Sequence, residues 1–275
     1  MVRISYEYTE DPSHPNYTKW TRSKNAAIKK GEFVKSILAK SINLENKKIL
    51  DLGSGSGGTL QNFLGSGNQL FSVDHSDDKL KAQKIISHEF NLIYSLAEKL
   101  PFKQKYFDVI ILQDSLEHFT DPYSVLNEIK NLLNEDGVIY ISTPNKFSII
   151  NLFADPHWGF PFVALFPRIL IRKIFIPLFR RQEIGRPGVA QLLSYKQLRS
   201  FFDELSLKSN IYTIEAVHTL ISKSEQIIWS KFHITLLKIL ASLKFERLLT
   251  LMANNKPGIL NRYFTPTFYF TLKKR

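Results

Sequence analysis

The sequence predicts an α/β fold, a doubly wound sheet of mainly parallel strands with helices on both faces. Two observations carry this prediction. Through the first 145 residues, short apolar runs typical of buried strands alternate with amphipathic segments typical of helices. The first of these runs leads directly into a cluster of glycines, which is where such a sheet commonly turns from its first strand into a helix.

The elements follow from the hydrophobic pattern in chain order. The front half contains strand-like runs at 48–52, 69–73, 91–94, 107–112 and 138–142. Helical spacing of apolar residues predicts helices at 26–40, 59–64, 79–90 and 123–133. Further on, Ser194 is placed to cap a helix, residues 223–253 are helical in period, and strands are expected at 207–217 and 267–272. Together these runs predict one sheet rather than two domains.

The alternation is interrupted twice, and we interpret both interruptions as insertions into the sheet. The chain is therefore expected to be one domain over 1–275. It divides into an N-terminal helical segment, a ligand-binding core, a lid-like insertion after the fifth strand, and a C-terminal part of the sheet with a helical insertion between the last two strands. The corresponding ranges are 1–45, 46–145, 146–193, 194–275 and, for the second insertion, 218–262.

Composition and charge exclude several classes of protein. With 44% hydrophobic and 23% charged residues, the chain is expected to fold. It has no cysteine, which excludes disulfide frameworks, thiolate metal sites and cysteine nucleophiles. The start of the chain lacks the apolar stretch of a signal peptide, so we expect a cytoplasmic protein. Residues 1–145 carry 17 Lys/Arg against 18 Asp/Glu (net −1), whereas residues 146–275 carry 20 against 7 (net +13). This asymmetry predicts that the back half faces an anionic partner or a membrane surface.

The residues around the first glycines indicate a ligand that carries both an amine and a ribose. Glycines at 53, 55 and 57 let the backbone bend and a ligand approach closely. Asp51, beside this loop, could accept hydrogen bonds from a cationic amine. Asp74 ends the next strand, where a carboxylate can bind the two hydroxyls of a ribose. A nucleoside that carries an amino acid satisfies all of these groups.

A dinucleotide is the competing interpretation. Gly53, Gly55 and Gly58 also fit the G-x-G-x-x-G pattern, and Asp74 fits it as well, which would make the protein an oxidoreductase. Asp51 argues against that interpretation, because a carboxylate so close to a pyrophosphate would repel it.

Six blocks in order resemble the class I S-adenosylmethionine-dependent methyltransferases, most closely the small-molecule methyltransferases of type 11. The blocks are Asp51–Gly57, Val73-Asp74, Ala97–Phe102, Phe107–Ile110, Asp114–His118 and Leu132–Gly137. The resemblance is dense over about 45–145 and looser beyond. It implies a Rossmann-like seven-stranded sheet whose last strand is antiparallel.

The same resemblance implies S-adenosylmethionine as cofactor, held by residues along the ends of the strands. The glycine loop would bind the methionine end, Asp74 the ribose, Ala97-Glu98 the adenine edge, and His75 would flank the adenine ring. Leu96 departs from the family, where many relatives have an acidic residue that bonds the adenine amine. The full expected set is Asp51, Gly53, Ser54, Gly55, Gly57, Asp74, His75, Ala97, Glu98, Gln113 and Asp114.

Two histidines are candidates for the base that removes a proton from a methyl acceptor. His118 follows the fourth strand at the edge where ligands bind, although Glu117 and His118 could instead only cap the next helix or close the loop. His157 lies in the first insertion, where the alternative is a structural loop packed by Trp158. Methyl transfer from a sulfonium requires no metal, and none is expected.

The segment 160–181 combines aromatic, aliphatic and basic residues. Its charges and prolines make it unsuitable as a membrane span, but it is typical of a surface that dips into anionic headgroups. The alternative is that it forms the lid's own core, with its arginines reaching outward. A nucleic-acid partner is disfavoured because the basic residues alternate with aliphatic ones.

The sequence thus predicts a methyltransferase acting on a small-molecule or lipid-linked acceptor, with oxygen favoured over carbon as the methylated atom. A peripheral membrane contact through the basic, apolar half accompanies this prediction. Two alternatives remain: an oxidoreductase that uses the glycine loop for a dinucleotide, and a non-catalytic relative that associates with membranes.

Overall fold

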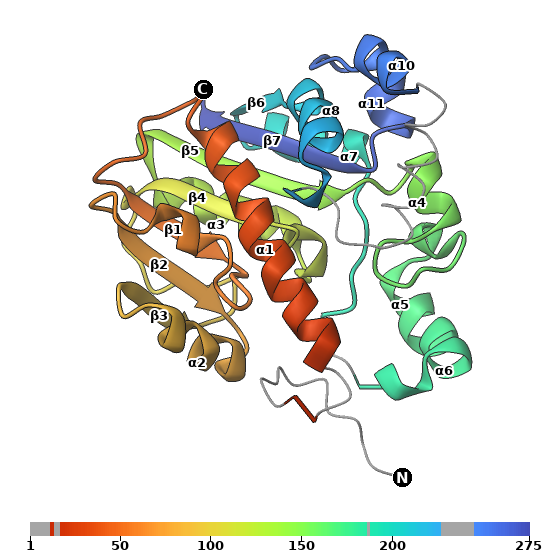
Figure 1. Ribbon diagram of the computed structural model, residues 1–275, viewed down its shortest axis with the longest axis horizontal. Helices are drawn as coiled ribbons and strands as arrows, with labels where there is room; N and C mark the ends of the chain where they lie inside the picture. The colour runs from red at the N-terminus through yellow and green to blue at the C-terminus, as the bar shows by residue number, and fades with distance from the viewer. Residues whose placement is uncertain (1–11, 14–16, 186–187, 227–244) are drawn as a thin grey trace.

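The computed structural model describes residues 12–13, 17–185, 188–226 and 245–275. Its centre is a seven-stranded sheet in the order β3-β2-β1-β4-β5-β7-β6 (Figure 1). The strands are β1 (Lys48–Leu52), β2 (Gln69–Asp74), β3 (Phe90–Tyr94), β4 (Phe107–Gln113), β5 (Leu133–Pro144), β6 (Leu207–Ile211) and β7 (Thr267–Lys274). The first five strands pair in parallel, and β7 runs antiparallel between β5 and β6. The prediction of a doubly wound sheet with an antiparallel last strand is confirmed.

Alternation along the strands divides the core into two layers. In β4, Ile110 and Leu112 face one layer, whereas Val109 and Ile111 face the other. The first layer packs against α3 (Pro122–Leu132) and α7 (Tyr195–Glu204), and the second against α1 (Tyr17–Leu38) and α8 (Thr213–Ser222). The short helices η1 (Leu60–Phe63) and α2 (Asp77–Ile86) follow β1 and β2. Because both faces are covered, the strands at the centre of the sheet are mostly apolar, as β1 and β4 show.

Several expected boundaries were wrong. The helix predicted at 79–90 is α2, which ends at Ile86, and Phe90 already belongs to β3. The helix predicted at 26–40 begins at Tyr17, because its first turns are polar and lack the apolar spacing that would reveal them. The strand predicted at 207–217 ends at Ile211, where pairing with Phe270 stops, and residues 213–222 form α8 instead. The alternating pattern there also fits a helix that buries Thr213 and Ala216 on one side. Most of the helix predicted at 223–253 lies outside the described residues.

The segment after β5 folds into a series of short helices with a small core of its own. They are α4 (Ile149–Phe153), η3 (Val163–Leu165), α5 (Arg168–Leu170), η4 (Ile171–Phe175), α6 (Ile176–Phe179) and η5 (Arg181–Glu183). Trp158, Ile171, Phe175 and Ile176 are among the residues of this core. Near the end of the chain, η6 (Ser224–Gln226), α10 (Phe245–Met252) and α11 (Ile259–Tyr263) precede β7. No helix in the described part of the chain has both the length and the hydrophobicity of a membrane span.

The start of α7 provides a direct test of local sequence signals. Ser194 accepts a hydrogen bond from the backbone N–H of Gln197, and the Gln197 side chain accepts one from the Ser194 backbone, which forms a capping box. We expect Ser194→Ala to lower the free energy of unfolding by about 1 kcal/mol in urea titrations. Ser200→Ala, on the exposed side of the same helix, is the control. An effect of Ser194→Ala no larger than that of the control would contradict the capping role.

Candidate functional site

The glycine loop lies where the strand order changes direction, between β1 and β4. Gly53, Gly55 and Gly57 all have positive φ, so each needs glycine for its backbone conformation. A Cβ on Gly53 would lie 2.7 Å from the Cβ of Ser115, in the loop after β4. A Cβ on Gly55 would meet nothing within 4 Å. The loop therefore packs tightly on its inner side and leaves open space at its middle glycine, as close approach of a ligand requires.

A network of buried polar side chains holds the glycine loop in place. Gln83, from α2, is fully buried and donates from Nε2 to the carbonyl of Gly55 and to Oγ of Ser54, over 2.7 and 2.9 Å. Ser72 donates to Oε1 of Gln83. A Cβ on Gly57 would lie 2.9 Å from the Gln83 side chain. Gln83 could not be identified from the sequence, because a glutamine in an amphipathic helix is usually exposed.

Asp51 and Asp74 are both buried beside the loop. Asp74 accepts hydrogen bonds from the backbone N–H groups of Gly55 and Ser76, each at 2.9 Å. Oδ2 of Asp51 has no hydrogen-bond partner among the described residues. Burial, and then the nearby charge of Asp74, raise the pKa of Asp51 to about 8. A buried carboxyl group with one oxygen that no described residue bonds fits the ammonium group of an amino-acid ligand, so these residues fit S-adenosylmethionine.

The raised pKa of Asp51 has a measurable consequence. In the free protein Asp51 keeps its proton up to about pH 8, whereas an adjacent ammonium group favours the ionised form. Binding of S-adenosylhomocysteine at pH 7 should therefore release close to one proton, measured by calorimetry in buffers of different ionisation enthalpy. Asp51→Asn should abolish the release, and Asp136→Asn, an exposed control, should retain it. Binding without proton release by the wild type would contradict this role.

The same shift sets the direction of the pH dependence of stability. Between the ordinary pKa of 3.8 and the folded value of about 8, the folded state holds a proton that the unfolded state has lost. The contribution of Asp51 to the stability of the free protein therefore falls as the pH rises through this window.

Helix α1 contacts the chain directly after β4 through Lys30. Asp114 accepts hydrogen bonds from Lys30 of α1 at 2.5 Å and from Oγ of Ser142 at 2.7 Å. Burial raises the pKa of Asp114, but the Lys30 ammonium and these hydrogen bonds outweigh it and leave the pKa below its usual value. Gln113 accepts a hydrogen bond from Thr59 in the glycine loop segment. Lys30 was missed by the sequence analysis, because one lysine in a polar helix carries no signal.

The expected adenine-side residues lie at the next strand ends. His75 is exposed, with Nδ1 3.6 Å from Asp74. Ala97 is buried and Glu98 is exposed in the loop after β3. Leu96, two-thirds exposed, offers an apolar side chain in that loop. His75 thus lies beside Asp74, which in turn bonds the glycine loop. Among the described residues, no hydrogen bond or ion pair joins Glu98 to that loop.

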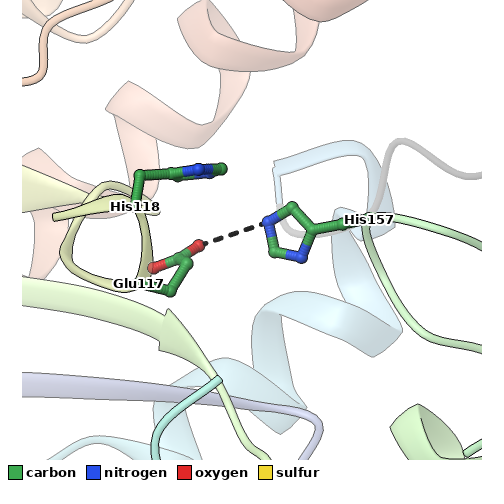
Figure 2. Close-up of side chains that lie close together, drawn as sticks. All are labelled: Glu117, His118 and His157. Carbon is green, nitrogen blue, oxygen red and sulfur yellow. Dashed lines mark ion pairs between the residues drawn. The ribbon is translucent and has the colours of Figure 1, made fainter. Parts of the chain in front are cut away.

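The two histidines predicted as catalytic lie near each other, and Glu117 lies beside them and pairs with His157 (Figure 2). The centroids of their rings are 5.1 Å apart. His118 comes from η2 (Leu116–His118), whereas His157 comes from the insertion after β5. Glu117 is fully buried, and its Oε1 lies 3.6 Å from Nε2 of His157. Neither Oε1 of Glu117 nor Nδ1 of His157 has a hydrogen-bond partner among the described residues. From the sequence, Glu117 was expected only to cap the next helix or to close the loop.

Contacts from both sides hold this cluster in place. Oε2 of Glu117 accepts a hydrogen bond from Oγ1 of Thr143 in β5, and Nδ1 of His118 lies 2.8 Å from the carbonyl oxygen of Gly188. The carboxylate of Asp155 accepts the backbone N–H groups of His157 and Trp158. Arg168 of α5 donates to the carbonyl oxygen atoms of Glu117 and Phe119.

The arrangement suits proton transfer, because a buried glutamate can orient and stabilise a histidine that accepts a proton. Nitrogen and oxygen atoms of Glu117, His118 and His157 also lie within 4.8 Å of one another, close enough to hold a divalent cation.

Comparisons with known proteins point to one family of enzymes. A family model described as a methyltransferase domain matches residues 21–209. A ubiquinone biosynthesis O-methyltransferase from Glaesserella parasuis serovar 5 is 33% identical over 116 residues, which are 39% of this chain and 49% of that protein. One from Pseudomonas fluorescens is 30% identical over 121 residues, 41% of this chain and 51% of that protein. The match spans about half the length of these curated relatives.

Solved structures share the fold at low sequence identity. An S-adenosylmethionine-dependent methyltransferase from Mesorhizobium loti superposes with a TM-score of 0.55 at 13% identity, over 87% of this chain and 96% of its own. A methyltransferase from Thermotoga maritima described as a possible histamine N-methyltransferase gives 0.54 at 12% identity, over 94% and 95%. These similarities support the fold.

Proposed function

Because this chain belongs to the class I S-adenosylmethionine-dependent methyltransferases and its cofactor is S-adenosylmethionine, we propose that it methylates a hydroxyl oxygen of a small, lipid-linked acceptor. The observation that carries the proposal is the pair formed by buried Glu117 and partly buried His157 beside the end of β4. Transfer to a hydroxyl needs a group that accepts its proton, and this pair supplies one.

The cofactor would be held by the group of residues around the glycine loop. Asp51 would bind the ammonium group and Asp74 the ribose, while Gly53, Ser54, Gly55 and Gly57 give the close approach. His75, Ala97 and Glu98 would border the adenine, and Gln113 and Asp114 the side facing the acceptor. When bound, the cofactor supplies a methyl group on sulfonium, which an oriented nucleophile displaces.

In this proposal His157 accepts the hydroxyl proton at Nδ1, the nitrogen turned away from Glu117. Oε1 of Glu117 then lies on the Nε2 side and stabilises the positive charge that the imidazole gains. Thr143 keeps the glutamate oriented through its other oxygen. His118, fixed at the carbonyl of Gly188, packs edge to face on His157 and limits its rotation.

Two observations support oxygen and a lipid-linked acceptor. The relatives that match the core are named as O-methyltransferases of ubiquinone biosynthesis. His157 itself lies on the insertion after β5, whose outer face is rich in exposed apolar side chains. An acceptor with an apolar tail would meet such a surface on its way to the histidine.

The test is methyl transfer from S-adenosylmethionine labelled in its methyl group, with pairs of phenols that differ only in a prenyl tail. The proposal predicts label on oxygen and a higher kcat/KM for the prenylated member of each pair. Label only on nitrogen or carbon acceptors would contradict it. Turnover lost in EDTA and restored by Mg²⁺ would assign the cluster to a cation instead of to proton transfer. Binding of S-adenosylhomocysteine without turnover of any acceptor would favour a non-catalytic relative.

A further inference from the structure

The outer face of the insertion exposes an unusual number of large apolar side chains. In Figure 1, α4, α5 and α6 follow one another down one edge of the molecule. We define the apolar edge as the exposed side chains of Phe153, Phe162, Leu165, Phe166, Ile169, Leu170, Ile174, Leu178, Phe179 and Ile184. Leu178 is 62% exposed and Phe179 is 57% exposed. Apolar patches of this kind mark surfaces that bind a partner or a membrane.

The burial pattern shows that these residues are not simply a loosely packed core. Across 168–179, Ile171, Phe175 and Ile176 point inward and pack with Trp158 and Val163. Between them the remaining apolar residues point outward. The insertion therefore packs a small apolar core of its own and also exposes other apolar side chains to solvent. The two sequence interpretations, a lid core and a membrane surface, each describe one side of the same segment.

Charge identifies the partner that fits this face. Residues 156–182 contain five Arg or Lys and no Asp or Glu. Two of these basic residues are used inside the protein: Arg168 donates to the loop carrying Glu117, and Arg180 donates to the carbonyl of Trp158. Arg172, Lys173 and Arg181 are exposed among the apolar side chains. Exposed cations interspersed with apolar residues match the interface of an anionic bilayer, where headgroups and acyl chains meet.

We infer that the apolar edge, with Arg172, Lys173 and Arg181, docks the protein on an anionic lipid bilayer. The acyl boundary receives the apolar side chains, and the phosphate groups pair with the three exposed cations. His157 lies on the same insertion, and Arg168 joins its helices to the loop of Glu117. Docking thus brings the proposed base close to molecules dissolved in the membrane. The docking surface itself does not depend on the proposed function.

The experiment is flotation of the purified full chain with vesicles of phosphatidylcholine, with and without 30% phosphatidylglycerol, at low and high salt. We expect binding to the anionic vesicles, weakened by salt. Leu178→Glu/Phe179→Glu should lower the bound fraction about tenfold or more, because two charges replace apolar contacts. Arg172→Glu/Lys173→Glu should remove the preference for anionic vesicles. The control is Ile85→Glu, 77% exposed on α2 and outside the edge, which should bind like the wild type.

Each other outcome overturns the inference. It fails if no vesicles bind at low salt, or if Leu178→Glu/Phe179→Glu binds as well as the control. It also fails if light scattering shows a dimer that these substitutions dissociate while vesicles remain unbound, because a second copy then covers the edge. S-adenosylhomocysteine binding, measured on every variant, establishes that the core is folded. Since this titration and flotation are separate readouts, failure of docking is distinguishable from failure of the proposed function.

Discussion

His157→Gln is expected to lower kcat by about 10²- to 10⁴-fold, which is the usual contribution of a general base. Glutamine is similar in size and keeps a polar group near Oε1 of Glu117, but it cannot accept a proton. Binding of S-adenosylhomocysteine should stay unchanged, because His157 belongs to the insertion and not to the glycine loop. The measurement is a rate assay with a saturating prenylated phenol, together with calorimetric titration of the variant.

Two other histidines sharpen this test. His88→Gln is the matched control, since His88 is exposed just before β3, at the end of the sheet opposite the site. It should have wild-type activity. His118→Asn preserves an N–H that can donate to the carbonyl of Gly188, and it should reduce kcat less than His157→Gln. A larger loss in His118→Asn would move the base from His157 to His118, and wild-type turnover in His157→Gln would eliminate the proposed role.

Asp74→Asn is expected to weaken binding of S-adenosylhomocysteine about 100-fold. The buried carboxylate accepts two backbone N–H groups and is the group proposed to bind the ribose. Asparagine has nearly the same shape, but its amide nitrogen cannot accept hydrogen bonds, so at least one of these interactions is lost. Calorimetric titration measures the affinity, and thermal unfolding separates this effect from loss of the fold.

Asp77→Asn is the matched control for this substitution. Asp77 lies three positions further along, at the exposed start of α2, where it pairs with Lys81. Its replacement should leave the affinity unchanged. If Asp74→Asn bound the product within threefold of Asp77→Asn, the ribose role of Asp74 would be contradicted.

The centre of the sheet was predictable because β1, β4 and the second half of β5 are buried on both faces and are nearly continuous apolar runs. The run at 107–112 became β4 almost unchanged, and Ser194 capped α7 as its spacing indicated. The boundaries of helices that bury only one side were harder to predict from the sequence. The first turns of α1 are polar, and α8 has a pattern that fits either a strand or a helix, so the sequence misplaced their boundaries.

The glycine loop was visible in the sequence because glycine and acidic residues there have specific backbone and charge requirements. The residues that hold the loop and its neighbours in place could not be identified from the sequence, since they come from distant segments of the chain. Gln83 comes from α2 and Lys30 from α1, and neither residue type signals a site by itself. The two candidate histidines were identified separately, but only the fold shows that Glu117 lies between β5 and His157.

The most direct test of the account is calorimetric titration of the wild-type protein with S-adenosylhomocysteine, with NAD titrated in parallel. The account predicts saturable binding of S-adenosylhomocysteine, release of close to one proton at pH 7, and no binding of NAD. Binding of NAD in place of S-adenosylhomocysteine would contradict it and assign the glycine loop to a dinucleotide.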